Sequence, residues 1–554
     1  MKRTITSLSF CFIAACTLSA TSFTTDTSGA WNSTYTWLAD GAQAEYAPGT
    51  EEASAASDSV SISQSVYLES TELYPIASLD IASTLIVYES NISSLSRVNV
   101  WGSPTSKAYL EVSGASSVEA LTSAFNNANV CIYDGATYSL SGDMSIFDST
   151  VDFMGSGTSF KLGNQNLVLK DSTVNFSDGA TLDAGGRDWI KFADGWESAK
   201  SEVVFNGSSI SNFVGNKTIY LAANANVTFK NTNFSGLFQT GDRLSDASLN
   251  FDNVTIDYIN GETTSNANFV WAFDLKVESG KTFSMNFKNS TQADVADKGI
   301  YFDSSSDNAE GNGGSVELNI SDSSSLKTSS NILFSTKLGA MNITNGSSIQ
   351  ANNITYSSTG ELAVSVSGSS SFICNDNTIF DASTGKVTFT VSDASKFSTN
   401  HIRLNEGSNA TIRLSALKNG NFVVQNDLIL SNSAKIEIDF SNENAWSADN
   451  TAAMITVGNT YVNGEEIEIV LDFSSVLLQE NTPCDFAVIS GGNTDRILES
   501  MFTILGDDNN LLSMVHRDNT WYASVVVVPE PASCAAAAAI LALTLAFAAK
   551  RRRG

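Results

Sequence analysis

A short pattern of alternating apolar and polar residues recurs along the chain at intervals of about 23 residues. Residues 149–153 and 172–176, for example, read Ser-Thr-Val-Asp-Phe and Ser-Thr-Val-Asn-Phe. The final apolar residues of the successive copies are Phe153, Phe176, Phe205, Phe229, Phe251, Phe287, Ile320, Ile343, Val366, Val391, Leu414 and Ile438. Because strict alternation places every second side chain on one side of a strand, each copy is predicted to be a strand with one buried face.

A second series of strands keeps the same spacing and the same phase. It comprises residues 331–334, 353–356, 377–380, 401–404 and 427–430. A unit of about 23 residues cannot bury its apolar face alone, whereas stacked units share one continuous core. We therefore predict an all-β fold, namely a parallel β-helix with coils of about 23 residues. Separate immunoglobulin-like sandwiches are the alternative, but they need about 100 residues each.

The Ser/Thr/Asn/Gly-rich coils resemble autotransporter passenger domains and bacterial adhesins, and this resemblance implies a right-handed β-helix. The period breaks after Trp446, where a terminal β cap would protect the open edge of the solenoid. The predicted organisation is a signal peptide at 1–22, an N-terminal β cap at 23–58, β-helix repeats at 59–445, a C-terminal β cap at 446–528 and a sorting signal with a transmembrane helix at 529–554.

The N-terminus has the order of a cleavable secretory signal. Lys2 and Arg3 precede an uncharged, largely apolar stretch over 4–18, and small residues follow at 19–22. Export through the Sec machinery is therefore expected. Two processing routes stay open, since cleavage after Ser22 fits the small-residue rule, while residues 13–16 match a lipoprotein box in which Cys16 would be lipidated.

The C-terminus carries a second targeting pattern. Its motifs are Val528, Pro529, Glu530 and Pro531, followed after an uncharged run over 532–549 by Lys550, Arg551, Arg552 and Arg553. Eighteen residues of helix reach about 27 Å, nearly the apolar thickness of a bilayer. The four terminal cations would stay on the cytoplasmic side, which leaves the rest of the chain outside the membrane. This topology agrees with the N-terminal signal.

This tail resembles the PEP-CTERM sorting signal of bacteria, with its three parts in the family's order over residues 528–554. The resemblance implies that an exosortase, a membrane-embedded transpeptidase-like enzyme, processes the tail near Pro-Glu-Pro. The protein would then pass from the membrane to the cell surface or the extracellular matrix. A permanent tail anchor with a chance Pro-Glu-Pro motif is the alternative.

The charge of the chain excludes nucleic acid as a direct partner, because the formal net charge is −29 at pH 7. The acids are scattered and form no calcium loop, and no zinc pattern or cofactor motif is present. Cys131, Cys374 and Cys484 lie outside the targeting segments and are too few and too far apart for a disulfide framework. They are predicted to be buried thiols, with a single disulfide pair as the alternative.

The sequence predicts no catalytic residues. β-Helical galacturonan hydrolases use clustered aspartates, Gly-His-Gly and Arg-x-Lys, and none of these is matched. Asp507 and Asp508 are interpreted as a turn, and His401 as a polar residue at the start of a strand. His516 has no Ser or Cys nucleophile motif to serve. We therefore expect a protein that is not an enzyme.

Four aromatic residues in the longest coils are candidate ligand contacts: Trp189, Trp196, Trp271 and Tyr301. Exposed rings with nearby acids would suit stacking on sugars, and the alternative is packing against the coil wall. The leading functional hypothesis is a structural or adhesive protein of the cell surface or of an extracellular polysaccharide matrix. A β-helix that binds or degrades polysaccharide is the second, and an ice-binding protein, which would need regular Thr-x-Thr ladders, is the third.

Overall fold

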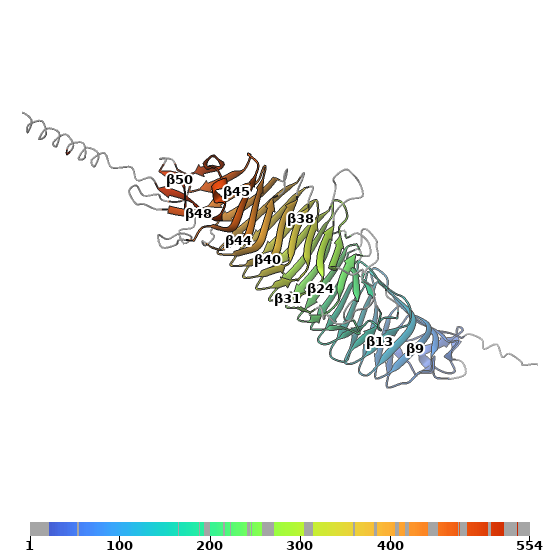
Figure 1. The fold of residues 1–554 in the computed structure, drawn as a ribbon. Coiled ribbons are helices and arrows are strands. Elements are labelled where there is room, and N and C mark those ends of the chain that lie inside the picture. Colours follow the sequence, from blue (N-terminus) through green and yellow to red (C-terminus); the bar gives the residue numbers. More distant parts are fainter. Residues whose placement is uncertain are drawn as a thin grey trace, which may run out of the picture. The chain divides into compact units, whose positions relative to one another are not determined.

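The computed structural model describes Ile540 and residues 21–525, apart from 52–54, 164–165, 188, 193–199, 214–216, 222, 241–243, 245, 258–270, 304–313, 358–359, 382–384, 405–408, 416–419, 441–451, 475, 477–484 and 508–510. The described residues are almost entirely strands and turns, with three short 3-10 helices. The chain divides into two compact units, residues 1–186 with 210–212 and residues 187–209 with 213–554. In both units, strands of successive coils pair in parallel (Figure 1), as in a β-solenoid.

Each unit contains strands of two sheets, here called sheet I and sheet II. In the first unit, sheet II contains β2 (Gly29–Ala30), β6 (Val66–Glu69), β8 (Thr84–Tyr88), β10 (Ala108–Ser113), β12 (Ala128–Tyr133), β15 (Thr150–Met154) and β18 (Thr173–Ser177). Sheet I contains β1 (Ser22–Thr25), β5 (Ser59–Ile62), β7 (Ile76–Ile81), β9 (Asn91–Trp101), β11 (Ser117–Asn126), β13 (Thr137–Leu140), β14 (Met144–Phe147), β16 (Ser159–Lys161), β17 (Asn166–Lys170) and β19 (Thr181–Asp183).

The second unit repeats this arrangement. Its sheet II contains β21 (Ser201–Asn206), β24 (Ala225–Lys230), β27 (Ala247–Asp252), β30 (Thr282–Lys288), β33 (Ser315–Ile320), β36 (Leu338–Ile343), β39 (Glu361–Val366), β41 (Lys386–Ser392), β43 (Asn409–Ser415), β45 (Lys435–Asp439), β47 (Glu468–Asp472) and β49 (Phe502–Leu505). Its sheet I includes β20 (Trp189–Phe192), β23 (Thr218–Leu221), β25 (Asn233–Phe234), β26 (Leu237–Thr240), β28 (Thr255–Asp257), β29 (Trp271–Lys276), β31 (Gln292–Asp294), β32 (Gly299–Asp303), β34 (Ser325–Lys327), β35 (Asn331–Ser335), β37 (Ser348–Ala351) and β38 (Asn353–Ser357).

Sheet I has two arms, because each coil bends within it. β40 (Ser371–Asp381) shows the bend directly: its first residues pair with β37, and after the bend it pairs with β38. A coil therefore contributes three strand segments, one to sheet II and two to sheet I. The sequence predicted only two segments per coil, because a strand such as β34 buries a single apolar residue, Leu326, and is too short to show alternation.

Aromatic rings stack from coil to coil in the core. Phe229 lies 5.7 Å from Phe251, and Phe251 lies 5.0 Å from Phe287, with near-parallel ring planes. In sheet I, Phe302, Phe334 and Tyr356 continue a similar stack. Parallel, in-register pairing places the same position of each coil at the same place on the wall, so the repeated phenylalanines form columns.

Polar side chains form matching ladders. On the outer face of sheet II, the Nδ2 of Asn286 donates to the Oδ1 of Asn250 at 2.7 Å, and Asn319 donates to Asn286 in the same way at 2.8 Å. At a buried corner, the backbone N–H of Ser324 donates to the Oγ of Ser347 at 3.2 Å, and that of Ser347 donates to Ser370. These ladders satisfy polar groups that the coil bends would otherwise leave unpaired.

The two ends of the chain depart from parallel pairing. Near the N-terminus, β3 (Trp37–Ala39) pairs antiparallel with β1, and the buried Trp31 and Trp37 rings make an edge contact at 5.0 Å. Near the C-terminus, parallel pairing extends beyond residue 445. It passes through β46 (Ile455–Asn463) and β48 (Asp485–Gly492) in sheet I and through β47 and β49 in sheet II.

The antiparallel hairpin of β50 (Leu512–Arg517) and β51 (Thr520–Val525) follows and pairs with β48. The sequence period breaks at residue 446 because the register partners Ile438 and Leu471 are separated by 33 residues instead of about 23. The register of the coil is kept, since Ile438 lies opposite Leu471. Parallel strand pairing is therefore continuous across the predicted boundary between repeats and cap.

Candidate functional site

The two predicted targeting segments fall almost entirely outside the described residues. This applies to most of the predicted signal peptide, including Cys16, to the motif over 528–531 and to the cations over 550–553. Of the predicted span over 532–549, only Ile540 is described. The part of the chain that the structure describes includes no helix with the length and hydrophobicity of a membrane span.

The aromatic residues singled out in the sequence pack against neighbouring rings. Trp189 of β20 lies 5.6 Å from Tyr220 in an edge contact. Trp271 of β29 lies 5.3 Å from Tyr301 of β32, and its ring covers Gly299, where a Cβ would come within 2.5 Å of the indole. All these rings are half-buried. Trp196 lies outside the described residues.

Asp274 lies beside this aromatic pair, directly opposite Tyr301 in the strand pairing. One carboxylate oxygen, Oδ1, is buried and has no hydrogen-bond partner. Burial raises the pKa of Asp274, and the nearby Asp303 raises it further, whereas Lys276 lowers it. Trp271, Asp274 and Tyr301 therefore bring a carboxyl group with an elevated pKa next to two aromatic rings, which we call the aromatic–acid cluster.

A shallow trough crosses the outer face of sheet II in the second unit. Glu317, Ala340, Ala363 and Thr388 face outward at matching positions of β33, β36, β39 and β41. The two small alanines leave a hollow of about 210 Å³ between the longer side chains.

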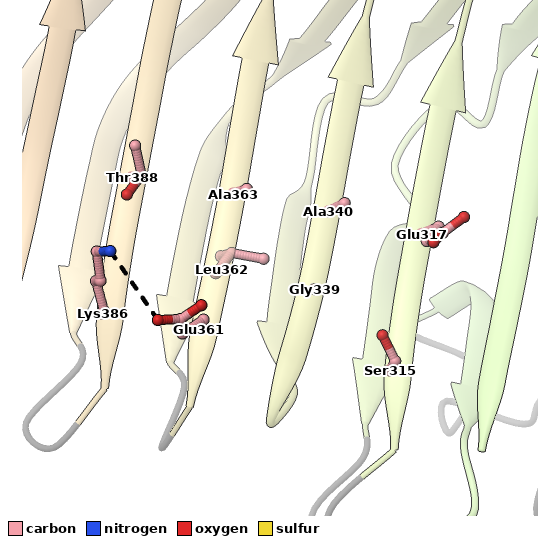
Figure 2. A pocket seen from close by; sticks show the side chains of 9 residues that line it. All are labelled: Ser315, Glu317, Gly339, Ala340, Glu361, Leu362, Ala363, Lys386 and Thr388. Carbon is pink, nitrogen blue, oxygen red and sulfur yellow. Dashed lines mark ion pairs between the residues drawn. The ribbon is translucent and has the colours of Figure 1, made fainter. Parts of the chain in front are cut away.

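Figure 2 shows the Nζ of Lys386 reaching toward Glu361 at the rim of this trough, at 4.0 Å. Both side chains are exposed, so this pair contributes little stability. The trough thus offers a small open hollow whose rim carries both signs of charge. Its polar groups do not converge on a common point (Figure 2).

Four tyrosines form a further surface on the outer face of sheet II in the first unit. Tyr67, Tyr88, Tyr109 and Tyr133 come from β6, β8, β10 and β12, which are four neighbouring strands. Tyr67 and Tyr88 are 51% and 42% exposed, and the other two are half-buried. We call these four residues, together with Glu111, the tyrosine face.

Glu111 is the polar centre of the tyrosine face. The hydroxyl of Tyr109 donates to its Oε2 at 2.8 Å, and the hydroxyl of Tyr133 donates to its Oε1. Burial and the bond to Glu111 raise the pKa of Tyr109, while the bond to Glu111 is the main cause of the raised pKa of Tyr133. Both tyrosines therefore keep their protons at neutral pH and hold the carboxylate in place.

The tyrosine face was not predicted from the sequence, although a signal for it is present. The four tyrosines recur at steps of about 22 residues, close to the coil length. Tyrosine is also a common strand residue, so each one alone fits the predicted strands. Only the strand register shows that all four lie on one outer surface.

The remaining residues noted in the sequence belong to the scaffold. His401 pairs in register with Asn377 and Asp427, and its Nδ1 lies 3.1 Å from the Oδ2 of Asp427. The carboxylate of Asp507 accepts two backbone N–H groups in a turn, and Asp508 lies outside the described residues.

His516 and two of the three predicted thiols lie within the described residues. His516 contacts the hydroxyl of Thr494 and the ring of Trp521. Cys131 and Cys374 are free thiols, half-buried and buried respectively, and Cys484 lies outside the described residues. Within the described residues, no three His, Cys, Asp or Glu side chains gather as metal ligands would.

Comparisons with known proteins return no match. No protein-family model matches the chain, and it matches neither a curated protein nor a solved structure. The geometry of the surfaces described above is therefore the basis for any assignment of function.

Proposed function

We propose that the chain is an exported, non-catalytic protein of a bacterial surface or extracellular matrix, with a structural or adhesive role on a β-helix scaffold. The observation that carries this proposal is the combination of two targeting segments with coils that are stacked by phenylalanine columns and asparagine ladders. Such coils hold outer side chains in fixed rows, which suits display of a surface.

The tail supports a transient membrane stage. Its alanine-rich apolar run is less hydrophobic than a leucine-rich span of equal length, which suits an anchor that is later removed. In this proposal, Lys550 to Arg553 hold the end of the tail on the cytoplasmic side. An exosortase-like enzyme recognises Pro529, Glu530 and Pro531 and releases the chain to the surface.

The test compares the native protein with a variant in which the Pro-Glu-Pro motif is replaced by three alanines. Intact mass and membrane fractionation are measured on protein from its native cells. Removal of the tail in the native protein and its retention in the variant would support sorting. A full-length, membrane-held product in both would make the tail a permanent anchor and refute the exosortase step.

A polysaccharide-cleaving enzyme is the second candidate, and one observation favours it. Asp274 has a raised pKa and lies near Asp303 and two aromatic rings, and glycosidases use one protonated and one ionised carboxyl group. Release of new reducing ends from a polysaccharide, abolished by Asp274→Asn, would support this candidate. No release by the native chain would reject it.

A further inference from the structure

We propose that the tyrosine face is a binding site for an extended, uncharged polysaccharide. The proposal deepens the adhesive role above and rests on it, because export would bring this face into contact with extracellular polysaccharide. The binding itself belongs to the first unit and can be measured on the purified chain. It does not depend on how the tail is processed.

The scaffold does not require tyrosines at these positions. In the second unit, the outward positions of β27 are Ser248, Asn250 and Asp252, which pair in register with Asn226, Thr228 and Lys230 of β24. The inner faces of both regions are alike, with buried residues such as Leu85 and Val87 in β8 and Leu249 and Phe251 in β27. The outward aromatic residues are thus a local addition to a fold that forms without them.

The tyrosines lie on four neighbouring strands but in different rows: Tyr67 shares its row with Glu111, Tyr88 lies opposite Ser113, and Tyr109 lies opposite Thr84. They therefore form a patch and not a single line across the coils. Neighbouring strands lie about 4.8 Å apart, so the four strands from β6 to β12 span roughly 14 Å. This distance is close to the length of three linked pyranose rings. An extended glycan that crosses these strands would contact tyrosines in more than one row, whereas a compact or coiled polymer would touch fewer of the rings.

The tyrosine face can contact both the apolar C–H face and the hydroxyl groups of a sugar ring. Tyrosine offers a rigid apolar surface with a polar tip, and its ring can stack on the C–H face of a pyranose. The carboxylate of Glu111, fixed by Tyr109 and Tyr133, has lone pairs left to accept hydrogen bonds from sugar hydroxyl groups. Charge-assisted bonds of this kind are stronger than bonds between neutral groups.

The charge around the face indicates an uncharged polymer. The described strands β6, β8, β10, β12 and β15 contain Glu69, Glu111 and Asp152 but no lysine or arginine. Together with the net charge of −29, these carboxylates would repel uronic-acid polymers at low salt. A cationic patch, which an acidic glycan would need, is missing from these strands.

The experiment measures binding of the full-length chain in mild detergent to soluble β-1,4-linked glucan, with polygalacturonate as the acidic comparison. The test variant is Tyr67→Thr with Tyr88→Asn, which introduces residue types found at outward positions of other coils. The matched control is Trp101→Asn, because Trp101 is 52% exposed in the same unit but belongs to sheet I. Far-UV circular dichroism and thermal unfolding verify that each variant is folded.

We expect the native chain and Trp101→Asn to bind the glucan and the double variant to bind at least about tenfold more weakly. Polygalacturonate should bind more weakly than the glucan at low salt. The proposal is overturned if the native chain does not bind the glucan, if the double variant binds as the native chain does, or if polygalacturonate binds equally well. Self-association that the double variant abolishes, without glucan binding, would instead assign the face to contacts between copies of the chain.

Discussion

The phenylalanine column of sheet II predicts a large and local loss of stability when one ring is removed. Phe251 is fully buried, and its ring stacks between those of Phe229 and Phe287 at 5.7 and 5.0 Å. It also meets the ring of Phe238 edge-on at 5.7 Å. Because the stacked coils are closely paired on both sides, the wall has little room to collapse into the space that the ring leaves.

Removal of a buried phenylalanine side chain costs about 3 to 5 kcal/mol. We expect Phe251→Ala to lower the free energy of unfolding by about 4 kcal/mol, at the middle of that range, since the ring has stacked neighbours on both sides. Phe251→Leu fills most of the volume and should cost about 1.5 kcal/mol. In a solenoid the loss should concentrate in the altered coil and its neighbours, β24, β27 and β30.

Urea unfolding followed by far-UV circular dichroism gives the free energy, and amide hydrogen exchange shows where protection is lost. Tyr461→Ala is the control, because Tyr461 is 36% exposed on an outward position of β46. A loss below about 1 kcal/mol for Phe251→Ala, or one no larger than for Tyr461→Ala, would refute the argument that the column carries the stability of this region. Equal loss of protection in all coils would refute its locality.

Three further predictions concern a buried acid, a close glycine and a ladder. Asp58 is fully buried, with Oδ1 unpartnered and a pKa raised by burial although the N–H of Gly49 lowers it. The folded state therefore binds the proton of Asp58 more tightly than the unfolded state does, and the free energy of unfolding falls as the pH rises from 3.8 through the folded pKa. Asp58→Asn removes this loss, so it should raise the melting temperature at pH 7 but not at pH 3. Gly299→Ala should displace the Trp271 ring, shift its fluorescence and cost about 1 to 3 kcal/mol, and an unchanged spectrum would contradict the contact. Asn319→Ala removes the bonds to Asn286 and Asn342 and should cost about 1 to 3 kcal/mol in urea unfolding, whereas Ser365→Ala, two coils further along the same row, should be nearly neutral.

The sequence was sufficient to predict the strands whose inward residues alternate over three or more positions. The apolar pairs Val151 with Phe153 and Val174 with Phe176 predict strands of sheet II. The series that starts at Asn331 predicts one arm of sheet I. The other arm was missed, because a three-residue strand such as Thr181–Asp183 buries only Leu182. One apolar residue among turn formers has no visible period.

The outer surface was harder to predict than the core. The sequence pointed to the longest coils, where Trp189, Trp271 and Tyr301 lie, and these rings pack half-buried against their neighbours. The tyrosine face lies within regular strands, where an outward tyrosine reads as an ordinary strand residue. Which side chains lie beside one another depends on the register between coils. A turn that is longer or shorter by one residue would change that register.

Stacking constrains the inward side chains of this fold, whereas the outward side chains are free to vary. An outward residue that departs from the polar ladders and lowers stability therefore indicates selection for something other than folding. The aromatic–acid cluster is such a departure: in the same row as Asp274, the neighbouring coil carries Gln239 and the coil after Tyr301 carries Leu333. A polar group buried without a partner costs about 1 to 3 kcal/mol, and Asn or Gln at this place would avoid the cost of a charge. If Asp274→Asn stabilises the chain and changes no interaction with polysaccharide, the cluster is a tolerated defect. If it stabilises the chain and abolishes cleavage or binding, the costly burial of the Asp274 carboxyl group is maintained for function.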